Sequence, residues 1–194
     1  MSKGEQTRIA IITAAANEFA QKGYAAVTMS DLCMATGLSR GGLYRHFSSP
    51  ARVFLAMLEA DKDYWAEEMG KGIREGQTAV QMLGYYLDRM REGIAQGQGR
   101  LSLAAYEFLR DEECPKDFAR RRFGEAVRLF EQLLCYGVAR GEFRACDVTA
   151  VAERYVVLID GLRLANATGV LSLEAVTRQM DAILHAIVMP KYDK

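Results

Sequence analysis

The sequence is short of proline, the residue that interrupts helices most strongly, and of histidine, a frequent catalytic residue. Its 194 residues include 3 prolines and 2 histidines. Long segments repeat their apolar residues at helical rather than alternating spacing, which predicts an all-α chain with a packed core. The two histidines are far apart in the chain, and the sequence has no phosphate loop, dinucleotide fingerprint or metalloprotease motif. We therefore do not expect an enzyme.

Cysteine chemistry is also sparse. The four cysteines, Cys33, Cys114, Cys135 and Cys146, form no CxxC pair. We interpret them as small apolar residues in a reducing compartment, and we predict no metal site and no cofactor. A redox sensor built on Cys114 or Cys135 is the alternative that the sequence leaves open.

Long apolar runs are missing as well. No segment approaches the roughly 18 consecutive apolar residues that a membrane-spanning helix needs. The first residues are polar, unlike those of a secretory leader. From the sequence we expect a cytoplasmic protein with no membrane partner.

The net charge is zero, but the charges are unevenly distributed along the chain. Residues 1–52 hold 6 lysines and arginines against 3 acidic residues, whereas the remainder holds 19 against 22. A basic end on an otherwise acidic molecule is typical of a protein in which only that end meets phosphate. Because the excess is small, two copies and good geometry would have to supply the affinity.

The most informative stretch runs from Thr28 to Phe47 and reads TMSDLCMATGLSRGGLYRHF. Thr28 and Ser39 can each cap the start of a helix with a hydroxyl oxygen. Gly37 lies between them and can adopt the left-handed conformation that ends the first helix. Two short helices joined by a glycine-containing turn of three or four residues are typical of a helix-turn-helix.

The second of these helices opens with a glycine pair, which costs on the order of 1 kcal/mol per glycine relative to alanine. Close approach of the helix to another surface would explain that cost. The outward side chains of this stretch suit base edges and phosphates. We predict base contacts from Ser39, Arg40, Gly41 and Gly42, and phosphate contacts from Thr28, Tyr44, Arg45 and His46.

The run GLSRGGLYRHFSS, preceded by TMSDLCMAT and by a helix ending in FAQKGYAAVTM, resembles the TetR family of bacterial transcriptional regulators. The likeness is close over about the first fifty residues, and beyond them only the layout of helices is similar. The resemblance implies a homodimer whose two heads read a palindromic operator in double-stranded DNA. It also implies repression that a small, largely apolar effector relieves. An effector-independent DNA-binding or architectural protein is the alternative.

This interpretation predicts two domains. Residues 1–49 would form a three-helix DNA-binding head, of which residues 1–6 would be an unstructured tail. Residues 50–194 would form a helical domain for ligand binding and dimerisation. Ser49 and Pro50 would begin a long connector helix between them, which we expect to end near Gly70 because Gly70, Gly72 and Gly76 suggest a loop.

The later helices carry the remaining predictions. Segments 148–167 and 172–188 are apolar over more than one stripe, which favours a four-helix bundle completed by a second subunit. The predicted dimer residues are Ile159, Gly161, Leu162, Met180, Ile183, Leu184 and Ile187. Aromatic residues suggest a ligand pocket between the middle helices, although a place in the packed core is the alternative for each. The predicted pocket residues are Trp65, Tyr86, Tyr106, Phe123 and Tyr155.

Overall fold

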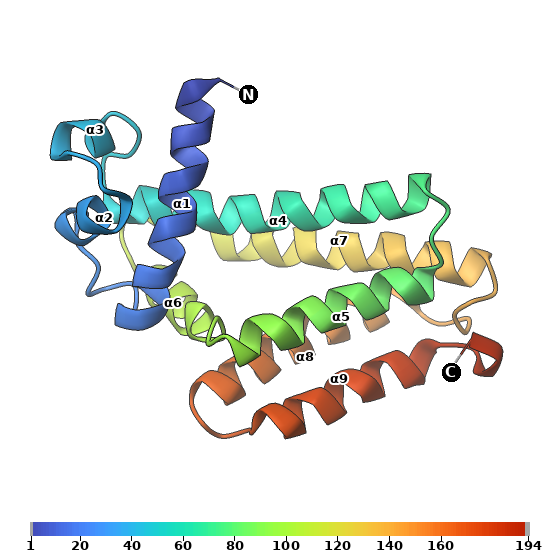
Figure 1. The fold of residues 1–194 in the computed structure, drawn as a ribbon. Helices are drawn as coiled ribbons and strands as arrows, with labels where there is room; N and C mark the ends of the chain where they lie inside the picture. The colour runs from blue at the N-terminus through green and yellow to red at the C-terminus, as the bar shows by residue number, and fades with distance from the viewer. Residues whose placement is uncertain (1, 193–194) are drawn as a thin grey trace. The chain divides into compact units, whose positions relative to one another are not determined.

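A computed structural model of the protein describes residues 2–192 and confirms the all-α prediction (Figure 1). The helices are α1 (Lys3–Lys22), α2 (Met29–Thr36), α3 (Arg40–Tyr44), α4 (Pro50–Arg74), α5 (Ala79–Ala95), α6 (Arg100–Phe108), α7 (Phe118–Ala139), α8 (Val148–Ala167), α9 (Leu173–Ile187) and the short 3-10 helix η1 (Pro190–Tyr192). An isolated antiparallel bridge joins Phe143 to Val188. None of the described helices combines the length and the apolar character needed to cross a membrane.

Most helices begin where the sequence predicted, because their caps are encoded locally. The Thr28 hydroxyl oxygen accepts from the backbone N–H of Asp31 at 3.2 Å, and the Asp31 carboxylate accepts from the backbone N–H of Thr28 at 2.8 Å. This reciprocal pair is a capping box. Gly37 ends α2 in the left-handed conformation, at φ 68°. Further side-chain caps at helix starts come from Ser39, Asp147 and Ser172.

Two expectations about helix ends are wrong. The first helix begins at Lys3, within the tail expected at residues 1–6, because Ser2 and Glu5 form a capping box of their own. Helix α4 continues through Gly70 and Gly72 to Arg74. Gly72 is buried, and a Cβ atom added there would lie 2.6 Å from the Met82 sulfur. Tertiary packing therefore overrides the weak helix propensity of glycine.

The chain folds into two compact units, which we describe separately. The first contains the residues up to Asp63 together with Gln98–Phe118, and the second contains Tyr64–Gly97 and the residues from Ala119 onward. Helices α1, α2, α3, α6 and the first half of α4 therefore belong to the first unit. The functional boundary expected between residues 49 and 50 stays a prediction.

Aromatic rings form the centre of the first unit. The ring centroids lie 4.7 Å apart for Phe19 and Phe54, 5.3 Å apart for Phe54 and Phe108, and 5.6 Å apart for Phe108 and Phe118. Each of these rings is at most 3% exposed. Pairs of this kind contribute about 0.5–1.5 kcal/mol each beyond the area that they bury. Segment 98–118 therefore helps to hold the head together.

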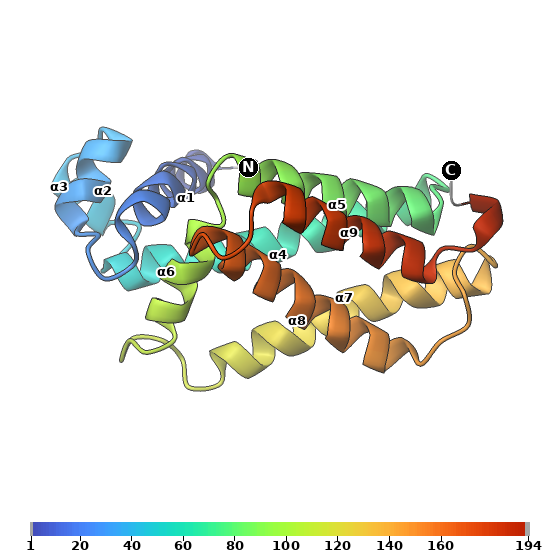
Figure 2. The same ribbon diagram turned by 90° about the horizontal axis from the view of Figure 1, so that it is seen from below.

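The core of the second unit is formed by side chains of α5, α7, α8 and α9. Helix α5 packs against α9 and α8, and α8 packs against α9 (Figures 1 and 2). The cluster is apolar, with the side chains of Leu83 and Met180 almost completely buried. Glu142 is 1% exposed and accepts from the backbone N–H of Ala79 at 2.5 Å, which fixes the start of α5.

Candidate functional site

Helix α3 is held on α2 by apolar side chains beneath it. Leu32 of α2 and Leu43 of α3 are completely buried, and Phe47 is 3% exposed. The ammonium group of Lys22 lies 2.8 Å from the Asp31 carboxylate and so links α1 to α2. The predicted helix-turn-helix is thus formed, with a turn of three residues from Gly37 to Ser39.

The outer face of α3 is open at its glycine pair. A Cβ atom added to Gly41 would have no atom within 4 Å, so nothing in the fold requires glycine there. Gly42 is half-buried, and a Cβ atom on it would lie 3.3 Å from the Ser39 hydroxyl oxygen that caps the helix. The Arg40 guanidinium lies 5.6 Å from the centre of the Tyr44 ring, which is 43% exposed. The face thus combines an open backbone, a cation and a phenol.

The other residues predicted to contact phosphate differ in exposure and in whether they are already hydrogen-bonded. The Thr28 hydroxyl donates to the Asp31 carboxylate at 2.6 Å and is therefore already engaged. Arg45 is exposed, whereas His46 is half-buried and its carbonyl oxygen accepts from Arg8 at 3.5 Å. The Arg8 guanidinium stands 4.2 Å from the centre of the Phe47 ring. Sequence reasoning did not single out Arg8, because its place beside the Phe47 ring depends on the fold.

Asp31 connects the electrostatics of the head to its stability. Its hydrogen bonds, first from Lys22 and then from Thr28, hold the pKa of its carboxyl well below the usual value near 3.8. The carboxylate therefore stays charged at neutral pH. The charged carboxylate strengthens both the hydrogen bonds that cap α2 and the ion pair with Lys22 of α1.

Helix α6 contributes polar contacts within the same unit. The Glu107 carboxylate accepts from the backbone N–H of Ala25 at 3.0 Å, beside the turn that leads into α2. The Ser49 hydroxyl, at the start of α4, donates to Glu113 at 2.6 Å. This hydrogen bond joins the start of α4 to an acidic turn at residues 111–113, in which Glu112 and Glu113 are exposed.

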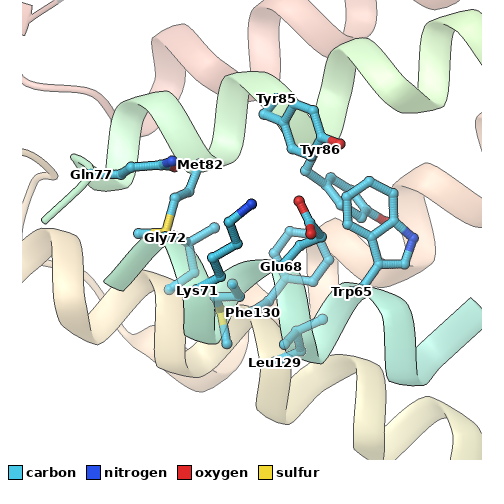
Figure 3. A pocket seen from close by; sticks show the side chains of 12 residues that line it. Trp65, Glu68, Lys71, Gly72, Gln77, Met82, Tyr85, Tyr86, Leu129 and Phe130 are labelled. Carbon is cyan, nitrogen blue, oxygen red and sulfur yellow. The ribbon is translucent and has the colours of Figure 1, made fainter. Parts of the chain in front are cut away.

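The second unit contains a cavity of about 250 Å³ (Figure 3). The residues that line it come from α4, α5, α7 and the α4–α5 loop. They are Trp65, Glu68, Met69, Lys71, Gly72, Gln77, Met82, Tyr85, Tyr86, Leu129, Phe130 and Leu133. A largely apolar concave site with a few polar groups is the usual form of a small-molecule site.

Aromatic rings continue from the cavity wall into the core of the second unit. The ring centroids lie 4.6 Å apart for Trp65 and Tyr86, 5.2 Å apart for Tyr86 and Phe130, and 6.1 Å apart for Phe130 and Tyr155. The Tyr155 hydroxyl donates to the carbonyl oxygen of Ile183 at 3.0 Å. These contacts therefore connect the cavity wall to α8 and α9 within this unit.

The structure brings two of the five predicted pocket residues to the cavity, Trp65 and Tyr86. Tyr155 lies behind the wall, in the core. Phe123 is 39% exposed on α7, and Tyr106 is 50% exposed on α6, which belongs to the first unit. Neither of these two lines the cavity.

Sequence reasoning missed the polar lining of the cavity. Glu68 and Lys71 follow Trp65 at intervals of three residues, which is close to the spacing of one helix face. That spacing was a usable signal, but charges on a long helix are usually solvated and these were passed over. Among residues 2–192 no cluster of three His, Cys, Asp or Glu side chains is arranged to hold a metal ion.

Comparison with known proteins agrees with the geometry of the head and of the helical second unit. Residues 11–57 match the family described as bacterial regulatory proteins, tetR family, and residues 82–177 match the tetracyclin repressor-like C-terminal domain. The HTH-type transcriptional repressor AcnR of Corynebacterium efficiens is 35% identical over 197 residues, which covers 97% of this chain and 96% of AcnR. The chain belongs to the TetR family.

Two further proteins are similar to this chain, one in sequence and one in fold. The uncharacterized HTH-type regulator YfiR of Bacillus subtilis is 29% identical over 157 residues, which cover 78% of this chain and 76% of YfiR. A TetR-family regulator of Agrobacterium tumefaciens shares the fold with a TM-score of 0.76 at 16% identity, over 96% of this chain and 100% of that one. TetR proteins are DNA-binding transcriptional regulators rather than enzymes, and this chain is such a regulator.

The predicted dimer residues of this TetR protein fall into two groups. Gly161 is exposed and Leu184 is half-buried. The remainder are at most 3% exposed and pack in the core of their own protomer, namely Ile159, Leu162, Met180, Ile183 and Ile187. Part of the double apolar stripe of α8 and α9 is thus buried within the protomer's own core. The exposed apolar residues of these helices include Val157, at 62%, and Leu173, at 41%.

Proposed function

We propose that this TetR regulator is a homodimeric repressor that a small, largely apolar effector in the cavity releases from a palindromic operator. One observation carries the proposal. The helices that line the cavity, α4, α5 and α7, all continue along the chain into segments that pack in the helix-turn-helix unit.

The continuity of α4 is the most direct of these connections. Phe54 near its start is buried in the core of the first unit, and Trp65 on the same helix lines the cavity of the second. Helix α5 leads into segment 98–118, and α7 begins at Phe118, which is also buried in the first core. An effector that binds one arrangement of these helices better than another would shift the population of head orientations.

Operator recognition would come from the outer face of α3. Ser39, Arg40, Gly41 and Gly42 would meet base edges, since the open surface at Gly41 permits close approach. Arg45, Tyr44 and the start of α2 would meet phosphates, which position the head without reading the sequence. Two heads spaced by one turn of DNA would then require a palindromic operator.

Dimerisation would use the exposed side of α8 and α9. Gly161 would allow close helix approach, and Val157, Leu173 and Leu184 would supply the apolar area around it. Two-fold symmetry would bring the same patch of both subunits together.

The test has two steps. Fragments selected from random DNA by the protein should contain inverted repeats, and a reporter promoter that carries such a repeat should be silenced. Compounds that raise the melting temperature bind the native state, and at least one of these should weaken operator binding by roughly 5- to 150-fold. If every compound that binds in the cavity leaves operator affinity unchanged, the protein is an effector-independent DNA-binding protein instead.

A further inference from the structure

We propose that the cavity selects organic cations, and that Glu68 together with Trp65, Tyr85 and Tyr86 forms its cation-binding end. The inference rests on the proposed function only in taking the cavity to be an effector site. The preference for one sign of charge is a property of the cavity itself and can be measured without DNA.

The geometry places one carboxylate among aromatic rings. Figure 3 shows the Glu68 carboxylate directed into the cavity, toward Trp65 and Tyr86. The Trp65 ring centroid lies 4.6 Å from that of Tyr86 and 6.2 Å from that of Tyr85. Aromatic faces carry partial negative charge and attract ammonium groups, most strongly where water is partly excluded. Rings and carboxylate thus favour the same sign of ligand charge.

Glu68 is half-buried, and within the described part of the chain no ion pair or hydrogen bond engages its carboxylate. The carboxylate is therefore available to a ligand that enters the cavity. A cationic ligand would supply an ionic partner for it. A neutral ligand would bury the carboxylate further, and an anionic ligand would be repelled by it.

Lys71 also lines the cavity, but its position is less restrictive. Figure 3 shows its side chain directed into the cavity beside Glu68. The residue is exposed, and its four-carbon stem allows the ammonium group to move into water while the stem covers apolar surface. When a cation occupies the carboxylate, like-charge repulsion would turn Lys71 outward.

The rest of the cavity suits an apolar body attached to the charged group. Its lining there consists of thioether and aliphatic side chains, which are Met69, Met82, Leu129 and Leu133. Methionine adapts to irregular shapes. The ligand class is therefore an aromatic or alkyl compound that carries an ammonium or quaternary ammonium group.

The experiment uses three probes of similar shape and different charge, namely phenyltrimethylammonium, tert-butylbenzene and benzenesulfonate. Each is titrated into the full-length protein without DNA, and binding is followed by Trp65 fluorescence and by calorimetry. Phenyltrimethylammonium should bind at least about tenfold more tightly than either of the others, since it alone can form a charge-assisted interaction with the Glu68 carboxylate.

Two variants locate the source of that preference. Glu68→Gln keeps the shape and should weaken binding of phenyltrimethylammonium by about 10- to 100-fold, while binding of tert-butylbenzene stays the same. Glu67→Gln is the matched control, because this neighbouring carboxylate is exposed and does not line the cavity. It should change neither affinity. Lys71→Gln should leave binding of the cation unchanged or strengthen it.

The inference is overturned if tert-butylbenzene or benzenesulfonate binds as tightly as phenyltrimethylammonium, if Glu68→Gln keeps the cation's advantage, or if none of the three binds. A separate gel shift with operator DNA distinguishes this failure from failure of the proposed function. A neutral effector that releases DNA would refute the cation preference alone. Cation binding that depends on Glu68 and leaves operator affinity unchanged would refute the effector role alone.

Discussion

Aromatic residues play different roles in the two compact units. In the first, Phe19, Phe54 and Phe108 are completely buried and touch one another at the centre of the core. In the second, Trp65 and Tyr86 are half-buried and line a cavity. The first set of rings has no free face, so it fixes the helices that it joins. The second set borders the open space of the cavity.

Under the proposed function, this contrast would let one chain combine a rigid recognition element with an adaptable one. DNA recognition needs a fixed α3, because misplaced side chains lose their hydrogen bonds with base edges. Effector binding needs helices that can settle in more than one arrangement. Substitutions should therefore affect stability and DNA binding differently in the two sets of rings.

The largest effect is expected from emptying the first core. Phe54→Ala should lower the free energy of unfolding by about 3–5 kcal/mol, because it removes a completely buried ring. Operator binding should be lost with it. Trp65→Ala should cost clearly less, since the indole is only half-buried, and operator binding without effector should survive. Urea unfolding followed by circular dichroism measures both, and equal losses would contradict the contrast.

Changing the face of α3 should affect DNA binding alone. Gly41→Leu should reduce operator affinity by roughly 10- to 100-fold, because the added side chain holds α3 away from the bases. The unfolding free energy should not fall and should rise by up to about 1 kcal/mol, since leucine is the better helix former and a Cβ atom at Gly41 meets no other atom. The binding of cavity ligands should stay the same. Gly41→Ala provides a graded control with an intermediate loss. Normal operator affinity for Gly41→Leu in a gel shift would refute the claim that glycine at this position allows α3 to approach the bases.

Phosphate contacts should give smaller and less selective losses. Tyr44→Phe should weaken binding to operator and to random DNA by a similar factor, roughly fivefold to tenfold, because phosphate contacts carry no base information. Arg45→Gln should lower the slope of log affinity against log salt by about 0.9. A loss of discrimination between the two DNAs would reassign these residues to base reading.

The smallest effect concerns acid stability of the head. Since the folded state holds the pKa of Asp31 below its usual value near 3.8, the ionised carboxylate stabilises the fold above that value. This contribution is fully present above about pH 4 and is lost as pH falls further. Asp31→Asn should therefore be less stable than the unmodified protein at pH 6, and the difference should shrink toward pH 3. A constant difference across that range in urea unfolding would refute this assignment.

Local features of the fold could be read from the sequence, and features assembled across helices could not. The caps at Thr28 and Ser39 depend on residues at most three positions away, so sequence alone located them. The end of α4 could not be read in this way. Gly72 remains helical because Met82, from the next helix, packs against it.

The lining of the cavity was even harder to predict from the sequence, because it is assembled from several helices. Trp65 and Tyr86 were predicted on residue type, and the structure brings both to the lining. Glu68 could be recognised only once α4, α5 and α7 were placed around it. The apolar pattern of α8 was real, but a pattern cannot tell a side chain buried in its own protomer, such as Ile159, from one that meets a partner.

The measurement that most directly tests the central claim follows both sites in one titration. The protein contains a single tryptophan, which lines the cavity, so its emission reports occupancy there. A compound that binds the cavity is added to the protein on fluorescently labelled operator DNA, and Trp65 emission and operator anisotropy are recorded together. The account predicts that both signals change over the same range of concentration, and that saturation weakens operator affinity by roughly 5- to 150-fold. A Trp65 signal that saturates while the operator stays fully bound would contradict it.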